Sequence, residues 1–282
     1  MLSTLIAITL WPFADFLYYL SIPVHPTWFP YPVATVLHAG RISLAFQANA
    51  RRVGAFDRLT WSAYITGFLI MCWGGGLISH ALLALPPPQL YSFGPYINYL
   101  TIHLCFTALT HMFPSILNHN KALDTLLFPV DALVRTKAII GTISLLGLPE
   151  VDPVLAESPL AHLILGAIGS SGGGVMAATL STWTTQWSFS TPIFLRPGVG
   201  WIDTIDVWGG ALVAAVYSIF SLQSTFYPVF ITSLDQQVIN LKLALSFIDA
   251  QAFSGLILTI LFGIRVYQIH YMSKVAVETK IQ

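Results

Sequence analysis

Three basic side chains lie deep inside stretches that are otherwise apolar enough to enter a lipid bilayer. Arg41 falls within residues 31–50, and Arg135 and Lys137 fall within residues 124–148. A cation at the centre of a membrane span costs about 2.5–3.5 kcal/mol even on a lenient insertion scale, so such residues mark functional sites by default. The first chemistry to consider is therefore the binding or sensing of charge inside a membrane.

An acidic residue, Asp131, precedes Arg135 by one helical turn and is placed to pair with it. This pairing leaves an excess of positive charge. The excess could hold a lipid phosphate, because arginine and lysine both bind phosphate well. Alternatively, Arg135 or Lys137 could sense the membrane potential, at about 2.3 kcal/mol per charge per 100 mV. A structural account also stands, in which Arg41 extends to the membrane surface and Arg135 simply pairs with Asp131.

Two glycine triples fall inside apolar stretches and raise a second chemical question. They are Gly74, Gly75 and Gly76 within residues 60–85, and Gly172, Gly173 and Gly174 within residues 159–183. Glycine is about 1 kcal/mol worse than alanine inside a helix, so two matching triples predict bent or interrupted helices. Backbone freed in lipid must face protein or water, which predicts an internal pocket or pore. The alternative is close helix packing through small residues.

Hydroxyl side chains beside the second triple are candidate cation ligands, together with freed carbonyls. The candidates are Ser170, Ser171 and Thr179. The intramembrane histidines, which include His38, His80 and His103, lack the closely spaced carboxylate or thiolate partners that metal sites need. We therefore expect no metal site, and we interpret these histidines as core or pore-facing polar residues.

The composition indicates what kind of protein positions these residues. Of 282 residues, 55% are hydrophobic and 9% are charged, and the mean hydropathy is +0.73. Soluble domains carry about 25% charged residues, so the sequence predicts a polytopic integral membrane protein. A formal net charge of zero argues against nucleic acid as a partner. Cys72 and Cys105 lie in apolar runs and are expected to be free thiols.

Seven stretches are long and apolar enough to cross a bilayer, which takes about 20 residues. The expected fold is therefore all-α, with transmembrane helices at about 31–50, 60–85, 95–117, 124–148, 159–183, 204–223 and 247–270. Residues 1–30 are expected to form an N-terminal interfacial segment, residues 224–246 a lumenal loop, and residues 271–282 a cytosolic tail.

The basic residues orient these spans. With seven spans, the side that holds the C-terminus collects Arg51, Arg52, Arg58, Lys121, Arg196, Arg265, Lys274 and Lys280. The opposite side holds only Lys242. This asymmetry is a strong positive-inside signal, so we expect the C-terminus in the cytosol.

Two landmarks recur at nearly one offset, which indicates an internal duplication. Pro32 and Pro129 are 97 residues apart (129 − 32), and Gly74 and Gly172 are 98 apart (172 − 74). The expected repeats, 31–118 and 119–223, contain three spans each. Because three is odd, the second copy must enter the membrane from the opposite face. Inverted repeats of this kind place the functional site near the bilayer midplane, between helices in matching positions.

The glycine triples, the inverted repeat and the basic cluster Arg135-Thr136-Lys137 together resemble the trimeric intracellular cation (TRIC) channel family. Ser79-His80 and Ala177-Ala178 stand where prokaryotic members of that family carry Arg-Asp after each triple. The resemblance implies a homotrimer in the endoplasmic reticulum or another intracellular membrane, with a pore in each protomer between the second and fifth spans. It also implies potassium-selective flux and, as in animal members, a bound anionic phospholipid.

Other classes of function remain open on the same features. Secondary transporters also combine inverted repeats with broken helices, and a non-conducting lipid-binding membrane scaffold is a further alternative. No nucleophile–base set or phosphate-binding glycine loop stands out, so we do not expect an enzyme. The expected partners are the lipid bilayer, potassium or another monovalent cation, and further copies of the chain. No cofactor is expected other than an anionic phospholipid.

Overall fold

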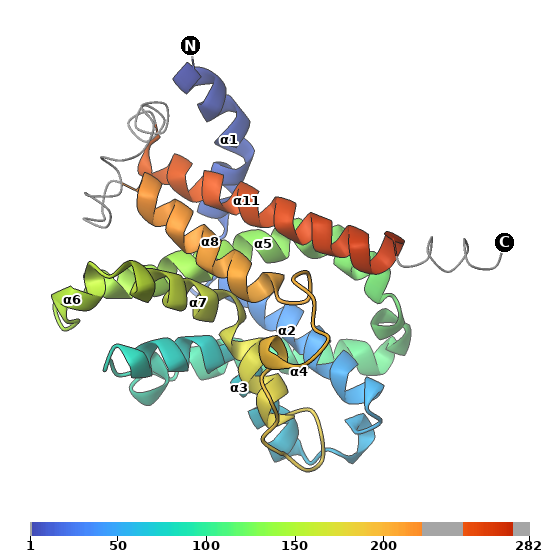
Figure 1. The fold of residues 1–282 in the computed structure, drawn as a ribbon. Coiled ribbons are helices and arrows are strands. Elements are labelled where there is room, and N and C mark those ends of the chain that lie inside the picture. Colours follow the sequence, from blue (N-terminus) through green and yellow to red (C-terminus); the bar gives the residue numbers. More distant parts are fainter. Residues whose placement is uncertain (1, 222–244, 273–282) are drawn as a thin grey trace.

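The structure is a computed structural model that describes residues 2–221 and 245–272 (Figure 1). Residues 224–244 of the predicted lumenal loop and residues 273–282 of the predicted tail lie outside the described residues. Within the described part the protein is all-α apart from one short hairpin, which confirms the predicted all-α class.

Nine α-helices make up the described part of the chain. They are α1 (Leu2–Tyr19), α2 (Val33–Arg52), α3 (Trp61–Leu82), α4 (Gly94–Met112), α5 (Asn120–Ser144), α6 (Pro153–Ala156), α7 (Pro159–Leu180), α8 (Ile205–Phe220) and α11 (Phe247–Tyr267). Short turns of tighter helix lie at Phe56–Arg58, Pro88–Leu90, Pro114–Asn118, Leu145–Gly147 and Ile193–Leu195. A turn of wider helix at Gln268–Met272 extends α11.

Three helices are long and apolar enough to cross a membrane. They are α3, α7 and the segment Phe247–Met272 that contains α11. A helix of 22 residues, as in α3 and α7, is about 33 Å long and matches the hydrocarbon thickness of a bilayer. The other four predicted spans overlap α2, α4, α5 and α8, which are not among the helices that are both long and apolar enough to cross a membrane; α8 is a shorter apolar helix.

α3 and α7 are built alike. At the start of α3, Thr60 Oγ1 accepts a hydrogen bond from the Ala63 amide, and Ser158 Oγ does the same for Ala161 at the start of α7. Each cap satisfies an amide that the helix itself leaves unpaired. Each glycine triple begins at the fourteenth residue of its helix (74 − 61 + 1 and 172 − 159 + 1).

α7 lies at the centre of the bundle, where it packs against α3, α5 and α8. α11 runs along α5 and α8, and α1 packs on α11. The core between α5, α8 and α11 is formed by fully buried apolar side chains that include Ile139, Val213, Leu258 and Phe262. This packing fixes α5 and α8 on either side of α7.

α3 and α7 cross with their backbones in contact at the glycine triples. A Cβ atom on Gly75 would lie 2.7 Å from the Ile168 carbonyl oxygen, and one on Gly173 would overlap the Met71 carbonyl oxygen. Only glycine allows two helix backbones to approach this closely. Close helix packing, the alternative interpretation of the triples, therefore accounts for Gly75 and Gly173.

Neither triple interrupts its helix. Helical structure continues through residues 74–76 and residues 172–174, so the expectation of interrupted helices is wrong. The glycines are required by the backbone contact between helices and not by a break within either one. Figure 1 shows that α3 and α7 lie side by side and change direction together part-way along their length.

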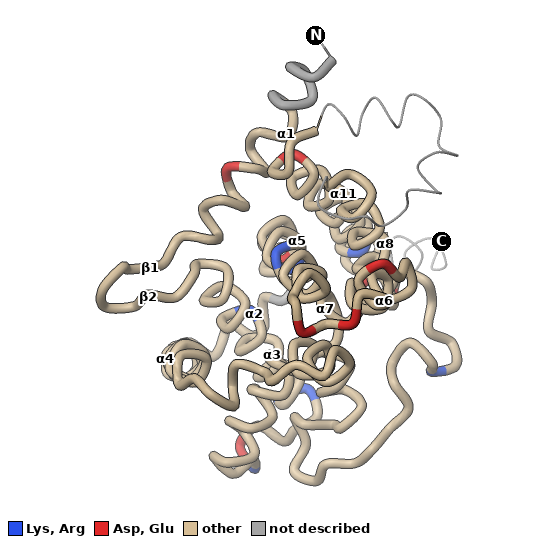
Figure 2. The backbone as a smooth tube through the Cα atoms, turned by 90° about the vertical axis from the view of Figure 1, so that its left-hand side faces the viewer, with Lys and Arg blue, Asp and Glu red and all other residues tan. Residues whose placement is uncertain are grey.

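The N-terminal segment 1–30 contains more structure than its sequence predicts. α1 leads into an antiparallel hairpin formed by β1 (Pro23–His25) and β2 (Phe29–Pro32). His25 Nδ1 accepts a hydrogen bond from the Trp28 amide at 2.9 Å, which closes the turn. In Figure 2 the hairpin projects from the bundle, and the Trp28 side chain is 84% exposed. The prediction of an interfacial segment for residues 1–30 does not include this hairpin.

Candidate functional site

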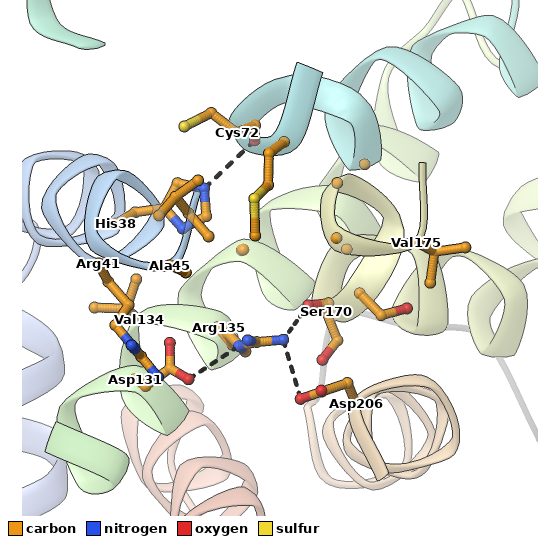
Figure 3. A pocket seen from close by; sticks show the side chains of 18 of the residues that line it. His38, Arg41, Ala45, Cys72, Asp131, Val134, Arg135, Ser170, Val175 and Asp206 are labelled. Atoms are coloured by element: carbon orange, nitrogen blue, oxygen red, sulfur yellow. Dashed lines mark hydrogen bonds and ion pairs between the residues drawn. The ribbon is translucent and has the colours of Figure 1, made fainter. Parts of the chain in front are cut away.

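A cavity of about 620 Å³ lies beside the glycine crossing, between α2, α3, α5, α7 and α8 (Figure 3). Gly76 and Gly174 line it, and a Cβ atom on either residue would meet no atom within 4 Å. The first two members of each triple are therefore pressed against the neighbouring helix, and the third member, Gly76 or Gly174, faces open space.

The predicted charged residues converge on this cavity. Its wall includes Arg41, Asp131, Arg135 and Lys137. α2 supplies the first of these and α5 the other three, so two helices at matching places in the predicted repeats present charge to one space. Figure 3 shows Asp131 and Arg135 directed toward each other at the base of the cavity.

Arg135 has the most polar contacts of the four. Its guanidinium Nε lies 3.4 Å from Asp131 Oδ2 and its Nη1 lies 3.1 Å from Asp206 Oδ1. The same Nη1 donates a hydrogen bond of 2.8 Å to the Ser170 carbonyl oxygen. The pairing with Asp131 is the one that the sequence predicts. Through these contacts Arg135 connects α5 to both α7 and α8.

Two members of this ion-pair network are absent from the sequence prediction. Asp206, in the first turn of α8, accepts Arg265 Nη1 at 2.6 Å as well as Arg135. The sequence predicts Arg265 at the cytosolic end of the last span, and the structure places it in the last turn of α11 with only 17% of its side chain exposed. The sequence does contain a signal for the pair of Asp206 and Arg265, because the two residues lie at the predicted cytosolic ends of adjacent spans.

Arg41 also has a carboxylate partner. Its Nη2 lies 2.7 Å from Asp124 Oδ1, and the other oxygen of Asp124 lies 3.0 Å from His270 Nε2. The predicted excess of positive charge is therefore wrong for Arg41 and Arg135, because Asp124 and Asp206 balance them. Lys137 differs, since it has no ion-pair partner within the described residues.

The three candidate hydroxyl ligands occupy different places. Ser170 and Ser171 line the cavity, whereas Thr179 is not part of its wall. The hydroxyls of Ser171 and Thr179 donate to carbonyls of their own helix, those of Ala167 and Val175, each at 2.7 Å. Such bonds use the hydroxyl hydrogen and leave the lone pairs of the oxygen available. The buried Ser170 Oγ has no hydrogen-bond partner in the described structure.

His38 belongs to the site, although the sequence assigns it no specific role. It lies on the cavity wall, and its Nε2 lies 3.4 Å from the Cys72 carbonyl oxygen. Because a carbonyl only accepts, a hydrogen bond at this contact requires the proton on Nε2. The imidazole also meets the Tyr99 ring edge to face, with centroids 6.1 Å apart. The sequence signal for His38 is its position inside the predicted span that precedes the first glycine triple.

A second cavity of about 280 Å³ adjoins the first. The two share wall residues, namely Arg41, Asp131, Ile193, Asp203 and Asp206. Arg265 and His270 line only the second cavity, on the side of α11. The ion-pair network thus lies where the two cavities meet.

Comparisons of the chain with models of protein families, with curated proteins and with solved structures give no match. The site is therefore interpreted from its geometry. Within the residues that the structure describes, no group of three or more histidine, cysteine or carboxylate side chains is placed to hold a metal ion. What the arrangement provides is a charged, hydrogen-bonding space inside apolar helices, which suits the passage or binding of a small ion.

Proposed function

We propose that the chain is a monovalent-cation channel of the TRIC type, with a pore in each protomer between α3 and α7. The observation that carries the proposal is the cavity of about 620 Å³ at the glycine crossing. It brings charged side chains into a bundle whose central helices are apolar enough to span a membrane. Helices that depart from straight geometry at matching positions of two repeats, around an internal polar site, are typical of membrane transport proteins.

The finer fold in this proposal is seven spans arranged as two inverted three-helix repeats and a seventh helix. Two contacts at the crossing support it. A Cβ atom on Gly74 would lie 3.1 Å from the Gly173 Cα, and one on Gly172 would lie 2.6 Å from the Gly75 Cα. Under the 98-residue offset of the repeats, Gly74 corresponds to Gly172 and Gly75 to Gly173. The contact of Gly74 with Gly173 is therefore the counterpart of the contact of Gly172 with Gly75. A two-fold axis through the crossing would have this effect.

Carboxylates on the shared wall support cations as the permeant species. Asp203 lines both cavities and has no ion pair within the described residues. Arg41 and Arg135, in contrast, are neutralised by aspartates. The unpaired carboxylate of Asp203 attracts cations toward the junction of the two cavities, whereas the wall of the larger cavity also carries Arg52, Lys137 and Arg196 without an ion pair in the described structure. We propose potassium or a similar monovalent ion as the permeant species, on the resemblance noted in the sequence.

The remaining parts of the proposal concern partners and location. The unpaired Lys137 is the residue best suited to hold the phosphate of an anionic phospholipid. The resemblance supports a homotrimer in the endoplasmic reticulum or another intracellular membrane. The distribution of basic residues supports a cytosolic C-terminus.

Recording from the purified protein in planar bilayers under asymmetric KCl tests the proposal. We expect currents that reverse near the potassium equilibrium potential, and none in bilayers treated with the same detergent without protein. Reversal near the chloride potential would contradict cation selectivity. Absence of current from folded protein would contradict the channel itself.

One observation favours a secondary transporter as a second candidate. The ion pairs between Arg135 and Asp206 and between Arg41 and Asp124 lie at or beside the wall shared by the two cavities. Ion pairs that separate two cavities are suited to alternating access. Flux that saturates with concentration and depends on a second solute would favour the transporter, whereas passive flux at channel rates would favour the channel.

A further inference from the structure

Two side chains approach matching carbonyl oxygens on the two crossing helices. Arg135 Nη1 donates to the Ser170 carbonyl oxygen on α7 at 2.8 Å, and His38 Nε2 lies 3.4 Å from the Cys72 carbonyl oxygen on α3 (Figure 3). Each accepting residue stands two positions before the first glycine of its triple. In both cases the donor comes from the first long helix of its half of the chain, α5 for Arg135 and α2 for His38.

The two contacts occur at the spacing of the internal duplication. Arg135 follows His38 by 97 residues (135 − 38), and Ser170 follows Cys72 by 98 (170 − 72). These are the offsets of the matching prolines and of the glycine triples. Both members of the pair are therefore repeated, so His38 is the counterpart of Arg135.

The position of the accepting carbonyls explains why they need a donor. In a regular helix the Cys72 carbonyl accepts from the Gly76 amide, and the Ser170 carbonyl accepts from the Gly174 amide. Gly76 and Gly174 are the members of the triples that face the cavity. Where a helix bends, these bonds lengthen, and in a membrane no bulk water replaces them. A side-chain donor from a neighbouring helix compensates for the weakened bond.

We propose that His38 is a positioning residue, which holds the bend of α3 at the Cys72 carbonyl as Arg135 holds that of α7 at the Ser170 carbonyl. The inference rests on the proposed function in that the bend shapes the pore between α3 and α7. The two donors differ in charge. Arg135 brings a cation that two aspartates balance, whereas a neutral imidazole supplies its N–H without adding charge to the cavity.

Replacing His38 by the two amide residues tests this role. In His38→Gln the side-chain amide reaches about as far as Nε2 and donates an N–H without a titratable group. In His38→Asn the amide is too short for the Cys72 carbonyl. We expect His38→Asn to reduce potassium flux into proteoliposomes roughly five- to tenfold, and His38→Gln to stay within about twofold of the wild type.

His80→Asn is the matched control. His80 is also on α3, but its Nδ1 contacts the Gly76 carbonyl of its own helix at 2.8 Å, and it is not part of the cavity wall. We expect wild-type flux from this variant. Equal flux from His38→Asn and His38→Gln would overturn the proposal, and so would a loss in His80→Asn as large as that in His38→Asn.

A second measurement does not depend on flux. Cys72 lines the cavity, so its thiol can be followed with a water-soluble methanethiosulfonate in a Cys105→Ser background. We expect His38→Asn to change the rate of modification roughly threefold or more, with His38→Gln and His80→Asn unchanged. If the wild type carries no flux, the proposed function fails, and the rates of thiol modification alone test the positioning role of His38. If His38→Asn does not fold, the proposal is still overturned when His38→Gln differs from the wild type in flux or in the rate of thiol modification.

Discussion

Adjacent glycines of each triple face very different surroundings. Gly75 and Gly173 lie against the backbone of the other helix, where an added Cβ would meet a carbonyl oxygen. Gly76 and Gly174, one residue further on, face a cavity in which an added Cβ would meet nothing within 4 Å. Identical residues in one run therefore have two roles: some allow the helices to pack closely, and the next one leaves the cavity open. The side of the helix on which each glycine lies determines its role.

The largest effect is expected from leucine on the crowded side. Gly75→Leu combined with Gly173→Leu must push α3 and α7 apart, and overpacking costs about 1–3 kcal/mol per site or more. The sum approaches the total stability of a typical protein, so we expect loss of folded protein. Size-exclusion elution and thermal unfolding in detergent measure it. Normal values in both would mean that the backbones are not in contact here.

The same substitution one residue further on gives the matched comparison. Gly76→Leu combined with Gly174→Leu places the side chains in the open cavity, so we expect normal elution and unfolding. Potassium flux should fall roughly tenfold or more, because the added groups narrow the path. Gly141→Leu on α5 is the control, since an added Cβ there meets nothing within 4 Å and the residue lies outside the cavity wall. Undiminished flux in the double variant would place the path elsewhere.

A smaller effect is expected from the charges on the open side. Asp206→Asn leaves Arg135 and Arg265 without the carboxylate oxygen that they share. Because Asp206 is 29% exposed, water offsets part of the loss, and we expect about 1–2 kcal/mol less stability. Asp203→Asn is the matched control, since Asp203 lines the same cavities without an ion pair in the described structure. Equal unfolding temperatures for the two variants would contradict a stabilising role for the network.

The smallest change in stability is expected at the unpaired cation. Lys137→Ala removes no ion pair of the described structure, so we expect its stability to stay within about 0.5 kcal/mol of the wild type. Its effect should appear instead as less anionic phospholipid retained through purification, measured by native mass spectrometry. Lys121→Ala on the same helix is the control, because Lys121 stacks on the Tyr271 ring at 3.9 Å. Equal lipid retention in both variants would exclude Lys137 as the phosphate ligand.

The features that could be predicted from the sequence are those set by local composition. Apolar stretches of sufficient length located the long helices to within a few residues, because a helix in lipid must satisfy its own backbone. Charges inside such stretches are rare and expensive, and for that reason Arg41, Asp131, Arg135 and Lys137 could be singled out as residues of one site.

The features that could not be predicted from the sequence depend on which sides of the helices face one another. The partners Asp124 and Asp206 lie near helix ends, where a carboxylate is ordinary and attracts no attention. The distinction between Gly75 and Gly76 requires the side on which α3 meets α7. The hairpin near Trp28 is too short for a periodic pattern in the sequence.

The carboxylate of Asp206 has a mechanical consequence. Its Oδ1 holds Arg265 of α11 at 2.6 Å and Arg135 of α5 at 3.1 Å, and Arg135 in turn holds a carbonyl of α7. Three successive polar contacts therefore connect the end of α11 to the helix beside the cavity. Loss of the one carboxylate at Asp206 would break the connection between the last helix and the centre of the bundle.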